Sequence, residues 1–143
     1  MAKKKSNTEK LHQIVVDALL DKKGKNVVSL DLRNIKDTPS DFFVIAHGDS
    51  STQVKALYTS VLHAAKEAGL QPYHKEGGEG AEWLIVDFVD VTVHVFYREK
   101  RDFYALEELW NDAVRTDHEE GPAELEEPKY NKATKASSVK GRK

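Results

Sequence analysis

Two apolar runs, "EWLIVDF" and "VTVHVFY", constrain the fold of this chain more than any other feature. Only Val89 and Asp90 separate them, so they predict an antiparallel hairpin in which Trp83 lies opposite Phe96. In that register one face is entirely apolar and is expected to form a core beneath helices. This face consists of Leu84, Val86, Phe88, Val91, Val93 and Val95.

The opposite face of the hairpin is too polar for a core and too aromatic for an ordinary wetted surface. Faces of this mixed composition often mark binding sites. We therefore expect it to point outward and to contact a partner; the alternative is that a further helix or the tail of the chain covers it. Its residues are Trp83, Ile85, Asp87, Thr92, His94 and Phe96.

Three amphipathic helices are predicted elsewhere in the chain. Two begin at capping boxes, Ser6 with Glu9 and Ser50 with Gln53, and they end at glycines near residues 24 and 69. The third takes Asp102 as its N-cap and runs to about residue 117. Its expected buried stripe is Phe103, Leu106, Leu109, Trp110 and Ala113.

Three further strands are predicted. Residues 27–32 alternate and predict a strand with one wet side, residues 42–48 are apolar on both faces and predict a central strand, and a short edge strand follows Pro72. A helix between the second and third of these is a natural parallel crossover, whereas residues 83–97 are antiparallel. The fold class is therefore α+β (α/β-like): a single domain with a mixed sheet of about five strands packed with helices.

Charge divides the 143 residues into a body and two ends. Residues 11–117 contain 12 Lys and Arg against 18 Asp and Glu, a composition that disfavours nucleic-acid binding by the folded body. We expect a flexible basic N-terminus at residues 1–6, a domain at 7–117, and a disordered tail at 118–143 that is first acidic and then basic. The basic end of this tail could make a weak contact with RNA.

No cysteine and no long apolar run occurs in the sequence. We therefore do not expect thiol chemistry, a zinc-finger framework or a membrane span. We expect a cytoplasmic protein. The histidines, including His47, His63, His74 and His94, lack the spacing of metal ligands. No metal or cofactor is predicted.

The chain lacks two motifs that would indicate catalysis. The segment "HGDSST" lacks the second glycine of a hydrolase nucleophile elbow. Two-metal nucleotidyl transfer needs carboxylates close enough to bridge both ions, and Asp87 and Asp90 lie three residues apart across a turn. The required pair is missing, so we do not expect an enzyme.

Three ordered blocks carry a family resemblance. They are "PSDFFVIAHGDSSTQVKAL", "EWLIVDFVDVTVHVF" and "KRDFYALEELW". Together they resemble the ribosomal silencing factor family, also called the Iojap family, over roughly residues 11–113. One departure is at the hairpin turn, where members usually have a glycine beside the aspartate and this chain has Val89.

The resemblance implies a nucleotidyltransferase-like topology without the catalytic carboxylates, and a role that is not enzymatic. It implies binding to the large ribosomal subunit at its ribosomal protein number fourteen, which blocks joining of the small subunit and represses translation under nutrient limitation. The partner-binding residues expected from the hairpin face and the third block are Trp83, Ile85, Asp87, Thr92, His94, Phe96, Arg101 and Tyr104. Two alternatives stay open: a metal-dependent nucleotidyltransferase-like enzyme, and a homodimeric adaptor module.

Overall fold

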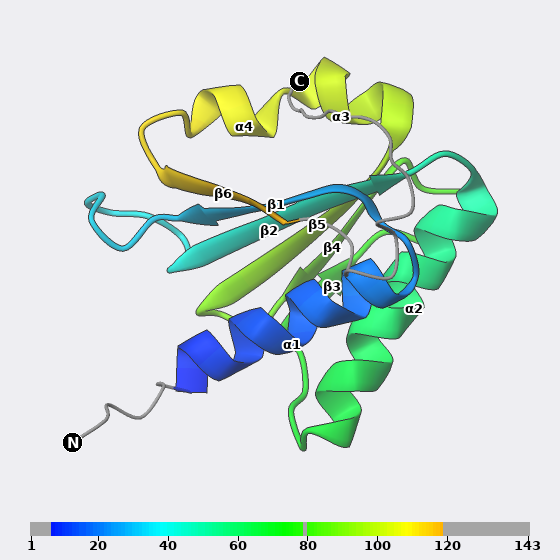
Figure 1. Ribbon diagram of the computed structural model, residues 1–143, viewed down its shortest axis with the longest axis horizontal. Coiled ribbons are helices and arrows are strands. Elements are labelled where there is room, and N and C mark those ends of the chain that lie inside the picture. The colour runs from blue at the N-terminus through cyan, green and yellow to red at the C-terminus, as the bar shows by residue number, and fades with distance from the viewer. Residues whose placement is uncertain (1–6, 79, 119–143) are drawn as a thin grey trace, which may run out of the picture.

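One mixed sheet organises the protein, whose computed structural model describes residues 7–78 and 80–118 (Figure 1). Its six strands follow the order β3-β4-β5-β2-β1-β6. Within the described residues the elements along the chain are α1 (Asn7–Asp21), β1 (Lys25–Asp31), β2 (Phe42–Gly48), α2 (Ser51–Glu67), β3 (His74–Glu76), β4 (Trp83–Asp87), β5 (Val91–Tyr97), α3 (Arg98–Tyr104), α4 (Leu106–Leu109) and β6 (Val114–His118).

The sheet is parallel only at its centre, where β2 pairs with β5, and the remaining neighbours are antiparallel. The helix α2 lies in the connection between these two parallel strands, as the crossover prediction required. Its N-cap is confirmed, because the Gln53 backbone N–H donates to the Ser50 hydroxyl at 3.1 Å. The predicted mixed α+β domain is therefore confirmed, with six strands in place of about five.

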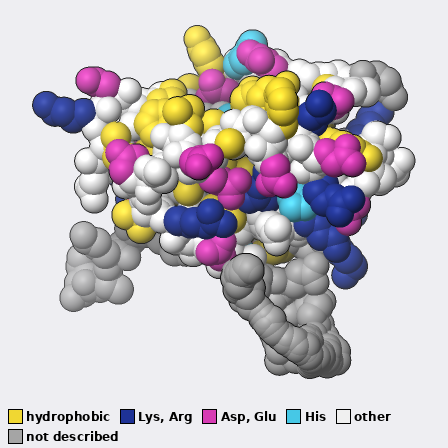
Figure 2. Space-filling view, turned by 90° about the horizontal axis from the view of Figure 1, so that it is seen from above, with side chains coloured by type: hydrophobic (Ala, Val, Ile, Leu, Met, Phe, Trp, Pro, Cys, Tyr) yellow, Lys and Arg dark blue, Asp and Glu magenta, His cyan; other side chains and the backbone are white. Residues whose placement is uncertain are grey.

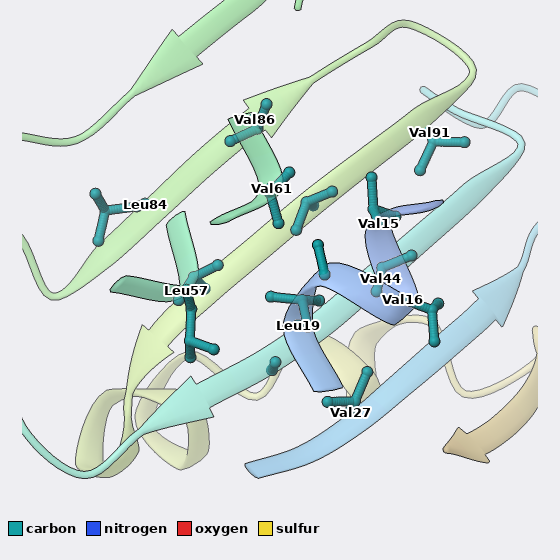
Figure 3. Packing of buried hydrophobic residues seen from close by; sticks show 14 of the residues in the cluster. Val15, Val16, Leu19, Val27, Val44, Leu57, Val61, Leu84, Val86 and Val91 are labelled. Carbon is teal, nitrogen blue, oxygen red and sulfur yellow. The ribbon is translucent and has the colours of Figure 1, made fainter. Parts of the chain in front are cut away.

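The helices α1 and α2 cover one face of the sheet, and α3 and α4 lie over the other (Figure 1). Beneath α1 and α2 lies the larger core, in which valines and leucines of both helices meet those of four strands (Figure 3). The apolar hairpin face belongs to this core as predicted. Its buried members are Leu84, Val86, Val91, Val93 and Val95.

A smaller core lies on the α3–α4 side. Leu106 of α4 packs there with aliphatic and aromatic side chains from β1, β2 and β5, and Trp83 and Trp110 border it. The strand β1 is consequently buried on both faces, so the predicted wet side is wrong: Val27 and Ser29 lie under α1. Alternation alone did not reveal that helices cover both faces of the sheet.

The predicted third helix from Asp102 to residue 117 is also wrong. The segment forms two short helices and then β6, which pairs with β1 at the sheet edge. Ala105 adopts a left-handed conformation, φ 50°, and interrupts the helix. The strand β6 includes His118, which the predicted boundary had assigned to the tail. None of the helices among the described residues is both long and apolar enough to cross a bilayer.

Candidate partner-binding surface

The hairpin has the predicted register. Trp83 pairs with Phe96, Ile85 with His94 and Asp87 with Thr92, so these six side chains share the face of the sheet under α3 and α4. The predicted turn at Val89 and Asp90 is confirmed as well, since the Phe88 N–H donates to the Val91 carbonyl at 2.8 Å.

The expectation that this whole face points outward is wrong for its β5 residues. His94 is 5% exposed and Phe96 is 0% exposed, because α3 and α4 pack over them. Thr92 is also buried, and its hydroxyl shares a 2.6 Å hydrogen bond with Ser40. These three residues support the surface from below and do not lie on it.

An aromatic row crosses from β4 to α3 at the surface. The half-buried Trp83 stacks on Phe96 at 5.0 Å between ring centroids and lies 4.6 Å from Tyr104. Phe103 packs edge-on against Tyr104 at 5.1 Å. Tyr104 is 44% exposed and Phe103 is 71% exposed. We call the surface formed by Trp83, Ile85, Phe103 and Tyr104 the β4–α3 surface.

Seen from the α3–α4 side, the molecule displays hydrophobic side chains in patches surrounded by charged ones of both signs (Figure 2). Beside the aromatic row, Lys100 lies over the Phe103 ring, 5.0 Å from its centroid, and pairs with Glu82 at 3.7 Å. Asp102 and Glu99 are exposed on α3. An apolar centre with a charged rim is the usual composition of a protein–protein interface.

Ile85 and Asp87 have different roles on β4. Ile85 is half-buried beside Trp83, on the face of the sheet that carries the aromatic row. The Asp87 carboxylate accepts from the Val89 N–H at 2.7 Å and from the Thr92 hydroxyl at 3.4 Å. Asp87 therefore fixes the hairpin turn, while Ile85 lies in the candidate surface.

Arg101 was expected at the surface but is buried. Its guanidinium donates two hydrogen bonds to the Glu107 carboxylate, at 3.0 and 2.8 Å, and one to the Asn26 carbonyl at 2.7 Å. It also lies 3.0 Å from Nδ1 of His47. With these donors engaged inside the fold, Arg101 ties α3 and α4 to β1 and β2.

Burial and the positive charge of Arg101 shift two pKa values in this cluster. Burial, followed by the positive charge of Arg101, lowers the pKa of His47 to about 4, so the imidazole is neutral near pH 7. Burial by itself raises the pKa of the Glu107 carboxyl, but the hydrogen bonds and charge of Arg101 outweigh it and hold that pKa below its ordinary value. Arg101 and Glu107 therefore form an ion pair at neutral pH.

Periodicity missed Phe103 as a surface residue. A continuous helix would have buried it on the same stripe as Leu106 and Leu109, yet both Phe103 and Leu109 are exposed. The break at Ala105 rotates the two halves of the segment relative to that stripe. No local signal in the sequence identifies a left-handed alanine, so only the fold shows that Phe103 lies at the surface.

The structure offers no metal-binding cluster within residues 7–78 and 80–118: no group of three or more His, Asp or Glu side chains there could hold an ion. The two carboxylates considered for catalysis both accept hydrogen bonds within the fold. Asp87 caps the turn as described, and the Asp90 carboxylate accepts from the Thr8 hydroxyl at 3.0 Å.

Comparison with known proteins identifies the family. The sequence-family model described as "RsfS: Ribosomal silencing factor during starvation" matches residues 5–143 of this chain. A ribosomal silencing factor of Halalkalibacterium halodurans is 41% identical over 107 residues, 75% of this chain and 91% of that protein. A mouse protein named "Mitochondrial assembly of ribosomal large subunit protein 1" is 35% identical over 74 residues, 50% of this chain and 32% of that protein.

A solved structure agrees with these sequence matches. The crystal structure of a Chromobacterium violaceum protein superimposes with a TM-score of 0.70 at 39% identity, covering 74% of this chain and 88% of the other. The family resemblance of the three sequence blocks is thus confirmed over the fold as well as the sequence, and the chain belongs to the ribosomal silencing factor family.

Proposed function

We propose that this protein is a cytoplasmic translational repressor that binds the large ribosomal subunit through its ribosomal protein number fourteen. Bound there, it sterically blocks joining of the small subunit and so represses translation under nutrient limitation. Family membership over most of the chain carries the proposal. The name of the mouse relative, which refers to assembly of a ribosomal large subunit, is consistent with a large-subunit partner.

The β4–α3 surface is the proposed contact. Aromatic side chains at the centre of an interface commonly supply most of its binding energy, and exposed charges at the rim mainly accelerate encounter. Trp83 and Phe103 offer the apolar centre, whereas Glu99 and Asp102 offer carboxylates to a basic ribosomal protein. This mechanism needs binding alone, without bond making or breaking.

Sedimentation with purified subunits tests the proposal. The protein should travel with large subunits in a sucrose gradient and should not travel with small ones. When both subunits are mixed, added protein should lower the fraction of joined ribosomes in proportion to the large subunits it occupies. Co-sedimentation with neither subunit, or binding that leaves joining unchanged, would contradict the proposal.

The two alternative functions give different signatures. A nucleotidyltransferase-like enzyme should melt at a higher temperature when magnesium and a nucleoside triphosphate are added, because a ligand of the folded state stabilises it. A homodimeric adaptor should sediment as a dimer, and large subunits should leave that dimer intact. A self-associating silencing factor, by contrast, should lose its dimer as large subunits are added, because both partners would use one surface.

A further inference from the structure

His94 lies directly beneath the β4–α3 surface and touches it through the indole of Trp83. The Trp83 Nε1–H donates a hydrogen bond to Nδ1 of His94 at 3.1 Å. Because Nδ1 accepts this bond, the hydrogen of the neutral imidazole resides on Nε2. His94 is too deeply buried to meet a partner itself, and its side chain is hydrogen-bonded to the β4–α3 surface through Trp83.

The imidazole is not the side chain that best fills this position. Its Nε2 is buried and has no hydrogen-bond partner among the described residues. Its surroundings are largely aromatic: Phe43 meets it edge-on at 4.6 Å and Trp83 lies at 5.8 Å between centroids. A buried donor without an acceptor destabilises a fold, so an apolar ring would suit the site better. What the imidazole adds is the acceptor at Nδ1.

Stacking leaves the orientation of the Trp83 indole incompletely fixed. One side rests on the buried Phe96 ring, and the other neighbour is Tyr104, which is partly exposed. Stacked rings slide and turn within their plane with little change in energy, whereas a hydrogen bond has a preferred distance and angle. The bond to His94 therefore selects one orientation.

We propose that His94 is a positioning residue for partner binding, which holds the Trp83 indole in the orientation that the partner contacts. The inference rests on the proposed function, since it requires that the β4–α3 surface docks on the ribosome. An anchor held in its bound orientation loses less conformational freedom on association. Removing the acceptor should thus weaken binding although no contacting atom has been removed.

Two substitutions separate positioning from simple structural support. His94→Phe fills the pocket but removes the acceptor, and the half-buried Trp83 can then turn its N–H toward water. His94→Asn is smaller and leaves a gap, but its amide oxygen stands close to the position of Nδ1 and can accept the same bond. The experiment measures melting temperature, affinity for purified large subunits, and the two indole N–H signals in nitrogen-15 spectra, with the Trp110 signal as internal reference.

The two variants should separate stability from binding. His94→Phe should melt at the same temperature as the unsubstituted protein or higher, bind about tenfold more weakly, and show faster solvent exchange of the Trp83 indole hydrogen. His94→Asn should melt lower, keep that hydrogen protected, and bind within about threefold of the unsubstituted protein.

Affinities that follow the order of melting temperatures, with Asn weaker than Phe, would overturn the inference and leave His94 a structural residue. Unchanged exchange of the Trp83 indole hydrogen in His94→Phe would overturn it also. Failure of the unsubstituted protein to bind large subunits would instead overturn the proposed function on which the inference rests. Normal binding by the unsubstituted protein and by His94→Phe alike would overturn the inference alone.

Discussion

Arg101 and Glu107 meet across the left-handed turn at Ala105, with Nη2 of the arginine 2.8 Å from Oε2 of the glutamate. The same guanidinium reaches the backbone carbonyls of Lys25 and Asn26, where β1 is irregular and Asn26 has a φ of 49°. One side chain thereby joins both short helices to the sheet. The presentation of Phe103 and Tyr104 depends on this attachment.

Replacing Arg101 with alanine should destabilise the protein by about 3 kcal/mol. The change removes the buried guanidinium that donates to the Glu107 carboxylate and to two backbone carbonyls, and breaking a buried ion pair usually costs this much. Urea unfolding followed by circular dichroism measures the difference. Arg115→Ala is the matched control, because Arg115 also pairs with Glu107, at 3.4 Å, but is half-exposed. A similar loss in both variants would argue against the buried attachment.

Replacing Val89 with glycine should stabilise the protein by about 1 kcal/mol. Val89 has a φ of 78°, a region that β-branched residues adopt only under strain, and its side chain is 52% exposed and contributes little packing. Thermal melting checks the change. Val114→Gly is the control: this valine is 59% exposed within β6, where glycine should lower stability. A lower melting temperature for Val89→Gly would show that the turn is not strained.

Acid should destabilise the fold between about pH 6.5 and pH 4. Burial lowers the pKa of His94 to about 3, and burial with the charge of Arg101 lowers that of His47 to about 4, from an ordinary 6.5. Within that window the unfolded chain binds more protons than the folded one, so falling pH favours unfolding. His12 and His118 are shifted in the same direction, first by burial.

The loss should reach about 3 kcal/mol or more between pH 7 and pH 4. Unfolding free energies from urea titrations at a series of pH values measure it. The His94→Phe variant removes one of the contributing imidazoles, so its stability should fall less steeply with acid. An equal slope in this variant would mean that the pKa of His94 in the folded protein is not lowered.

Truncating the aromatic row should weaken binding to large subunits. Trp83→Ala should reduce affinity about 30-fold and Phe103→Ala about tenfold, because aromatic side chains dominate interface energies. Phe103→Ala is the cleaner test, since its exposed ring supports little of the fold and stability should change by less than about 0.5 kcal/mol. Subunit pull-downs at several protein concentrations give the affinities.

Leu70→Ala serves as the surface control for that series. Leu70 is an exposed apolar residue just after α2, on the other side of the sheet from α3 and α4. Its truncation should leave subunit affinity unchanged. Equal effects of the two substitutions on affinity would argue that the contact does not lie on the β4–α3 surface.

Removing residues 119–143 should flatten the salt dependence of subunit binding. We propose that the basic end of this segment, which lies outside the described residues, makes a weak contact with ribosomal RNA, and each neutralised phosphate steepens the dependence of affinity on salt. Binding is measured at a series of salt concentrations for the full chain and for a chain ending at His118, which keeps β6 intact. Parallel slopes would show that the tail does not touch RNA.

The local pattern of the chain was enough to predict the hairpin, its register and its buried face. Alternating apolar residues around Val89 and Asp90 admit one pairing in which Leu84 and Val86 share a side with Val93 and Val95, because a one-residue slip would turn the valines toward solvent. The capped helix α2 was equally determined, since its cap and apolar stripe are local. The family blocks added the class of function.

Which hairpin residues meet solvent depends on long-range packing, which the local pattern does not contain. His94 and Phe96 have the composition of a binding surface, but the break at Ala105 folds α3 and α4 over them and leaves Phe103 outside. The sequence predicts Arg101 as a surface cation. In the fold it contacts the Asn26 carbonyl of β1 and His47 of β2. Burial depends on which distant segments pack against a residue, and contacts of that kind leave no local pattern in the chain.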